Sequence, residues 1–147
     1  MAKDLFTAEE KKAVTAAVGE AESHTSGEIR IHLERRCRED VLDHAAFIFE
    51  ELEMHKTELR NGVLFYISFE DHKLAILGDA GINAKVGDDF WVKIKDHMVS
   101  EFKKGNHASG LSEAVIMAGK ALSEHFPKGK DNPNELSNEI SYGDSAK

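Results

Sequence analysis

Apolar and polar residues repeat along this chain with two different periods, which predict both helices and strands. Between Thr7 and Glu22 the apolar residues recur at steps of three and four, the spacing of one face of an α-helix. Thr7 and Glu10 have the spacing of a capping box, so the helix should begin after Thr7. Its buried face should consist of Val14, Ala17, Val18 and Ala21.

Residues 28–34 alternate strictly between polar and apolar side chains, which predicts a half-exposed β-strand. On this pattern His32 belongs to the polar, solvent-facing side. A helix should follow from an Asp40 cap to about Glu58, because apolar residues again recur at helical spacing. Two strands come next, at 62–68 and 73–78, and the short polar connection between them predicts a hairpin.

Two further helices are expected in the second half of the chain. One should begin near Asp88 and end at Lys103–Gly105, where cations and a glycine suit a helix C-terminus. The other should run from Leu111 to about His125, before Pro127. Residues 128–147 contain few large apolar groups, so we expect a flexible tail there.

Helices before, between and after a small sheet predict an α/β fold, a three-layer α/β/α sandwich. We expect one domain at 1–127, with a mixed sheet of three to four strands and about four helices. The helix after strand 28–34 should cross over to strand 62–68, which makes these two strands parallel.

Charge narrows the class of function. The chain carries 27 acidic and 19 basic residues, a net charge of −8, which disfavours a general nucleic-acid binder. The same acidity favours divalent cations, basic partners or solubility alone. Cys37 is the only cysteine, so no internal disulfide can form. No apolar stretch resembles an export signal or a membrane span, and we therefore expect a soluble, cytoplasmic protein, a monomer that does not associate with membranes.

Carboxylates should gather at one end of the sheet. If strands 28–34 and 62–68 are parallel and 73–78 returns antiparallel, Glu28, Arg60, Asn61 and Asp79 lie at the same rim. Asp88 and Asp89 follow only a few residues later. Carboxylates with nearby backbone carbonyls suit hard cations, Ca²⁺ or Mg²⁺. Asp88 and Asp89 also suit a helix start and Asp79 a turn, and both interpretations stay open. The segment is no EF-hand, because Ala84 and Phe90 occupy the positions of its required Gly and Glu.

Several motifs, taken in order, resemble the TPM domain family. They are Gly27-Glu28-Ile29, Asn61-Gly62-Val63-Leu64, a glycine turn from Gly78 leading to Asp88, and Phe102-Lys103-Lys104-Gly105 before Gly110-Leu111. The resemblance implies an α/β/α sandwich that binds a divalent cation, most often calcium. Some members have been proposed to be acid phosphatases, and others act as assembly or repair factors. With the resemblance, the expected metal ligands are Asp79, Asp88, Asp89 and Glu28.

Three functions therefore stay open. The first is a non-catalytic calcium-binding (or magnesium-binding) domain. The second is a metal-assisted phosphatase in which Arg60 would bind the phosphoryl anion. The third is an interaction scaffold without a metal. The sequence offers no cysteine-phosphatase loop, since Asp43 stands where an arginine would be needed, with five residues between it and Cys37.

Overall fold

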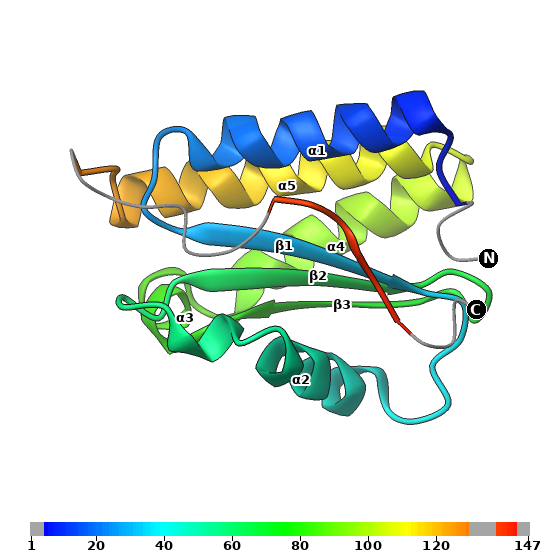
Figure 1. Cartoon of the computed structure of the whole chain (residues 1–147), viewed down its shortest axis with the longest axis horizontal. Helices are drawn as coiled ribbons and strands as arrows, with labels where there is room; N and C mark the ends of the chain where they lie inside the picture. The colour runs from blue at the N-terminus through cyan, green and yellow to red at the C-terminus, as the bar shows by residue number, and fades with distance from the viewer. Residues whose placement is uncertain (1–4, 130–137, 144–147) are drawn as a thin grey trace.

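The chain forms a mixed four-stranded sheet with helices on both faces, which confirms the predicted three-layer α/β/α sandwich (Figure 1). The computed structural model describes residues 5–129 and 138–143. The strand order is β3-β2-β1-β4. β1 (Glu28–Glu34) and β2 (Gly62–Ser68) are parallel, and β3 (Lys73–Gly78) is antiparallel to β2, as predicted.

The larger core lies between the sheet and three helices. α1 (Ala8–Glu22) and α5 (His107–His125) pack side by side, and α4 (Asp88–Lys103) completes that layer. The capping box of α1 is present as predicted, with Thr7 and Glu10 bonded in both directions. Alternate residues of β1 and β2 fill this core, among them Ile29, Ile31, Val63 and Phe65.

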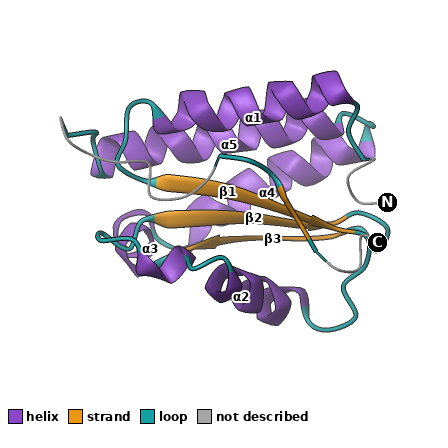
Figure 2. Cartoon of the chain, viewed as in Figure 1, coloured by secondary structure: helices purple, strands orange, loops and turns teal. Residues whose placement is uncertain are grey.

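The opposite face of the sheet carries a smaller core beneath α2 (Val41–Glu51). Asp40 caps this helix as predicted, but the helix stops at Glu51 instead of about Glu58. Glu53 adopts a left-handed backbone conformation, with φ 59°, which breaks the helix. A 3₁₀ turn, η2 (Met54–Lys56), follows and buries Met54. Figure 2 shows the helices on both sides of the strands.

Three further elements differ from the sequence prediction. α3 (Ala80–Val86) is a short helix where only a turn was expected. α5 begins at His107, four residues before the predicted Leu111. β4 (Ser141–Tyr142) lies within the segment predicted to be a flexible tail. The other described parts of that tail are residues 128–129, 138–140 and 143, and the rest lies outside the described residues.

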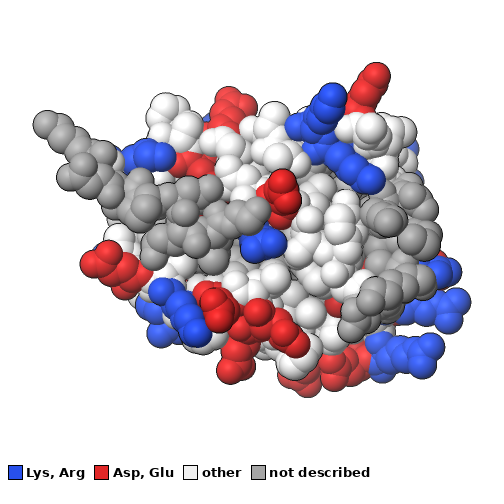
Figure 3. Space-filling view, viewed as in Figure 1, with Lys and Arg blue, Asp and Glu red and all other residues white. Residues whose placement is uncertain are grey.

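Acidic side chains gather along the side of the molecule where α2 lies (Figure 3). From Asp40 to Glu53 the sequence has five acidic residues and neither Lys nor Arg; the acids are Asp40, Asp43, Glu50, Glu51 and Glu53. Such a face favours cationic partners. None of the helices within the described ranges combines the length and the apolar character needed to cross a bilayer.

Candidate functional site

The strand register brings the predicted rim residues together. Glu28 of β1 is aligned with Gly62 of β2, and the Asp79 amide donates to the Gly62 carbonyl at 2.9 Å. Gly62 therefore lies between the backbones of Glu28 and Asp79. This part of the prediction, the return of the chain to one end of the sheet, is confirmed.

The strongest polar contact at this rim is an ion pair between Arg60 and Asp79. Arg60 Nε lies 2.7 Å from Asp79 Oδ2, and an Arg60 Nη lies 2.8 Å from Asp79 Oδ1. The Asp79 side chain is 6% exposed, whereas that of Arg60 is 51% exposed. Hydrogen bonds from the guanidinium to this carboxylate raise the pKa of Arg60.

Asp79 also begins α3. Its Oδ1 accepts a hydrogen bond from the Ala80 amide at 2.7 Å, and the Gly81 amide donates to the Arg60 carbonyl at 2.7 Å. The loop before β2 is thereby joined to the start of α3. Asp79 therefore caps a helix, where the sequence suggested that it stabilises a turn. Arg60 would have to leave Asp79 to bind a phosphoryl anion as predicted.

Asp88 and Asp89 lie at a separate place. Both are exposed in the first turn of α4, and Gly87 is the residue that caps this helix. The seven residues of α3 put about 10 Å of helix axis between Asp79 and Gly87. Two ligands of one calcium ion lie within about 5 Å of each other. Asp79 and the Asp88–Asp89 pair therefore do not form one compact group.

Glu28 is buried and separated from Asp79 by β2. The space above Gly62 is filled by Met54, whose carbonyl oxygen would lie 3.3 Å from a Cβ at position 62. Within residues 5–129 and 138–143, no three His, Cys, Asp or Glu side chains are arranged to hold a metal ion. The four-carboxylate ligand set thus stays a prediction, and the single compact site it implies does not fit the described side chains.

A hydrogen-bonded cluster of titratable side chains lies at the other end of β1, and the sequence prediction missed it. His32 Nε2 lies 3.2 Å from Glu34 Oε1, and His44 Nε2 lies 2.8 Å from the same oxygen. The remaining nitrogen of His44 bonds to Glu39. His32 and Glu34 are buried, so the predictions of a half-exposed strand and of a surface His32 are wrong. Their cover comes partly from α2, which follows β1 in the chain, and from the segment that holds β4, which is distant in sequence.

Tyr66 packs between the imidazole rings of His32 and His44. Its ring is stacked on His32 at a centroid distance of 5.9 Å and meets His44 edge-on at 5.4 Å. Its hydroxyl is buried and makes no hydrogen bond with the described residues. Burial, together with the nearby Cys37 and Glu34, raises the pKa of Tyr66. The hydroxyl thus stays protonated at this buried position.

His44 should make the stability of the domain depend on pH. Burial lowers the pKa of His44, but hydrogen bonds to Glu34 and Glu39 outweigh burial and raise it above 6.5. The protonated ring stabilises the folded state below that pH, and this contribution is lost as the pH rises through the raised pKa. We expect His44→Gln to lower the melting temperature at about pH 6, with a smaller loss at about pH 9.

Thermal melts across this pH range test the expectation, with His97→Gln as the matched control. His97 pairs with Glu113 on the exposed surface, so its replacement should leave the pH profile close to that of the wild type. A loss in His44→Gln that is the same at both ends of the pH range would show that the ring acts only by packing.

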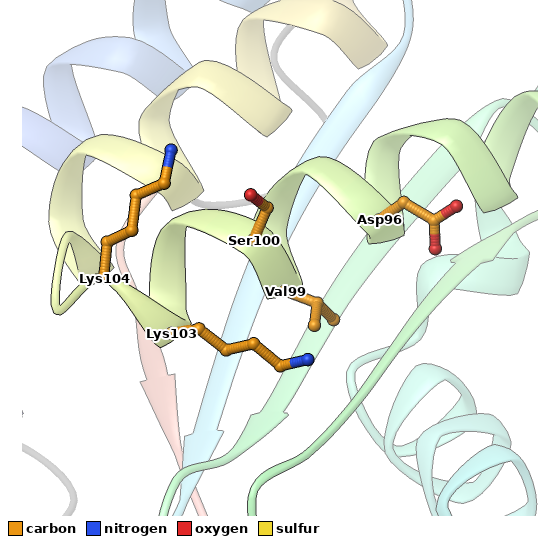
Figure 4. Close-up of a pocket in the computed structure, with 5 residues that line it drawn as sticks. All are labelled: Asp96, Val99, Ser100, Lys103 and Lys104. Carbon is orange, nitrogen blue, oxygen red and sulfur yellow. The ribbon is translucent and has the colours of Figure 1, made fainter.

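A surface hollow of 490 Å³ lies along α4 (Figure 4). It is lined by Asp96, Val99, Ser100, Lys103 and Lys104, which all come from α4 and its C-terminal cap. Lys104 extends away from the other four side chains in Figure 4. Because its polar groups come from one helix and do not converge, we assign it no chemistry.

Comparisons with known proteins agree with this architecture. The structure of BA42 protein from the psychrophilic bacterium Bizionia argentinensis is 45% identical and superposes with a TM-score of 0.90, covering 97% of this chain and 99% of that chain. The N-terminal domain of a protein from P. gingivalis is 19% identical, with a TM-score of 0.71 and coverage of 86% and 83%, and shows the same fold. A search of curated proteins finds no match. The family model described as TPM domain matches residues 2–121, and this chain therefore belongs to the TPM domain family.

Proposed function

We propose that this TPM domain binds a hard divalent cation, calcium in preference to magnesium, at Asp79 in exchange for the guanidinium of Arg60. The observation that carries the proposal is the bidentate ion pair between a buried carboxylate and a half-exposed arginine. The guanidinium occupies both carboxylate oxygens from the solvent side. A cation that reaches Asp79 replaces the guanidinium as the partner of the carboxylate. The charged end of Arg60 can then move into water.

Backbone oxygens support an oxygen-rich site next to this carboxylate. The carbonyl oxygens of Leu59 and Arg60 approach the start of α3 so closely that a Cβ on Gly81 would lie 2.1 and 2.6 Å from them. Calcium takes six to eight oxygen ligands in flexible geometry and accepts carbonyl oxygens and water, whereas magnesium demands stricter octahedral geometry. Asp79 with nearby carbonyls and water suits the first ion better. With one carboxylate, the affinity should be weak, in the range of about 0.1–1 mM.

Asp88 and Asp89 contribute to the proposal through their charge. Both are exposed in the first turn of α4, beyond the far end of α3. Their negative field raises the local concentration of cations without direct ligation, and salt should weaken this effect. Glu28, buried on the other side of β2, has no direct role in this version of the site.

Calcium titrations of three variants test the exchange. Asp79→Asn should abolish the calcium-dependent shifts of the Ala80 and Gly81 amides. Arg60→Gln should tighten calcium binding by about ten-fold, because it removes the competing cation. Asp88→Asn with Asp89→Asn should weaken binding by only about two- to three-fold. Amide chemical shifts measured against Ca²⁺ and then Mg²⁺ give both the position and the ion preference.

Arg36→Gln is the matched control, because Arg36 is an exposed arginine that also pairs with a carboxylate, that of Glu70. It should leave the calcium affinity unchanged. If Arg60→Gln weakened calcium binding, or if Asp79→Asn left it intact, the exchange at Asp79 would be wrong. Binding lost only in the Asp88–Asp89 double variant would move the ion to the start of α4.

A further inference from the structure

The outer edge of β1 is covered by a very short strand. β4 contains only Ser141 and Tyr142, which are aligned with His32 and Leu33 in parallel register. Figure 1 shows this segment, in red, crossing beside β1. The amide of Gly143 extends the pairing by donating to the Leu33 carbonyl at 3.0 Å. Such a short pairing holds a segment in place mainly through its side-chain contacts.

Position 141 is matched to a hydroxyl. Ser141 Oγ lies 2.7 Å from His32 Nδ1 and 3.2 Å from the Ile31 carbonyl oxygen. A neutral His32 that donates through Nε2 to Glu34 presents Nδ1 as an acceptor for the Ser141 proton. A charged His32 instead donates to Ser141 Oγ, and the hydroxyl donates to Ile31. A hydroxyl at position 141 can therefore hydrogen-bond to His32 whether the imidazole is neutral or charged. An alanine at this position can form no such bond.

Position 143 is matched to a glycine. A Cβ at this residue would lie 2.3 Å from both Cγ and Cδ of Glu34. Glu34 cannot move aside easily, because it is buried and its Oε1 lies within hydrogen-bond distance of His32 and His44. Any larger residue at 143 would push the segment away from β1. Tyr142, between the two, is 37% exposed and under no comparable restriction.

Position 139 is matched by charge. Glu139 lies in a bend, two residues before the aligned pair of His32 and Ser141. The negative charge of Glu139 acts on the Arg30 guanidinium, and Arg30 Nε is buried without a hydrogen-bond partner in the described part of the chain. Two alternate residues of the segment thus face two alternate residues of β1, Ser141 with His32 and Gly143 with Glu34, and Glu139 adds a charge that acts on Arg30.

We propose that the outer edge of β1 is a docking site for extended polypeptide segments of the pattern Glu-x-Ser-x-Gly, which the chain's own residues 139–143 occupy and a partner segment can displace. Docking is by parallel strand addition, in which main-chain bonds give affinity and alternate side chains give specificity. The site is independent of the cation proposal, because it lies at the opposite end of β1. The covalently attached segment acts as a local competitor at an effective concentration in the millimolar range.

Opening the site in the full-length chain tests the proposal. Gly143→Val should release the attached segment, because the added side chain cannot fit beside Glu34. The probe is a labelled peptide of sequence Asn-Glu-Ile-Ser-Tyr-Gly, identical to residues 138–143. We expect it to bind the Gly143→Val protein at least about ten-fold more tightly than the wild type, because the attached competitor is gone. Shifts of the Ile31 and Leu33 amides should report the binding.

Matched peptides test the pattern. Replacing the peptide's serine by alanine or its glycine by valine should each weaken binding by about ten-fold, while replacing its tyrosine by alanine should have little effect. In the protein, Tyr142→Ala is the control that should leave the attached segment in place. If Gly143→Val does not fold, Glu139→Lys combined with Ser141→Ala weakens the attached segment without adding bulk near Glu34. Failure of the peptide to bind either opened protein, or binding indifferent to its serine and glycine, would overturn the proposal.

Discussion

Replacing Gly81 with alanine is expected to destabilise the domain by about 3 kcal/mol and to lower its melting temperature by roughly 10 °C. A Cβ at this position would lie 2.1 Å from the Leu59 carbonyl oxygen and 2.6 Å from that of Arg60. Both obstacles are backbone atoms, so no side-chain rotation relieves the clash. The loop before β2 and the start of α3 must move apart, which breaks the hydrogen bond from Gly81 to Arg60.

Thermal and denaturant unfolding of Gly81→Ala measure this effect, with Gly19→Ala as the matched control. Gly19 lies inside α1, and among the described residues a Cβ there would meet only the Asn138 amide nitrogen, at 4.0 Å. Alanine is the better helix former, so Gly19→Ala should be neutral or stabilising by up to about 1 kcal/mol. If Gly81→Ala unfolded like the wild type, the close approach that supports the cation proposal would be absent in solution.

Replacing Glu22 with glutamine is expected to stabilise the domain in alkaline solution. Burial raises the pKa of Glu22 from 4.5 to about 8, despite the hydrogen bond that its carboxylate accepts from the Ile29 amide at 2.6 Å. The folded state therefore holds a proton that the unfolded state releases. The resulting stability is fully present below pH 4.5 and is lost as the pH rises towards about 8.

The glutamine keeps an oxygen for the Ile29 amide and never ionises. The free energy of unfolding of Glu22→Gln, relative to that of the wild type, should therefore increase by on the order of 3 kcal/mol as the pH rises from about 5 to about 9. Denaturant unfolding at several pH values measures the difference, and His44 contributes equally to both proteins. Glu20→Gln, an exposed neighbour on α1, should show no such gain. A difference between wild type and Glu22→Gln that does not change with pH would mean that Glu22 is ionised when folded.

The predicted elements that hold are those coded by local periodicity. The alternation of residues 28–34, the apolar runs at 62–68 and 73–78, and the helix at 88–103 all appear at those bounds. The apolar spacing repeats along the whole of each element. One or two residues that depart from the pattern therefore do not change the prediction. α3 escaped prediction because its seven residues are too few to show a helical period, although Asp79 could have been read as its cap.

Burial of polar groups could not be predicted in the same way. Glu22, His32 and Glu34 each look solvent-facing in the sequence, yet all three are buried. His44 of α2 and Gly143, which help to enclose Glu34, lie 10 and 109 residues away along the chain. The meeting of Arg60 with Asp79 was predictable, because strand direction alone returns both to one rim. Whether the four carboxylates lie in one group could not be predicted, because α3 separates Asp79 from Asp88 and Met54 fills the space above Gly62.

The pairing of α1 with α5 has a consequence for how the chain folds. These two helices form one layer, although about a hundred residues separate them. The β2–β3 hairpin, by contrast, closes over a few residues. Loop-closure entropy should therefore favour an early nucleus around the hairpin, with docking of α1 on α5 as a late event in the refolding kinetics.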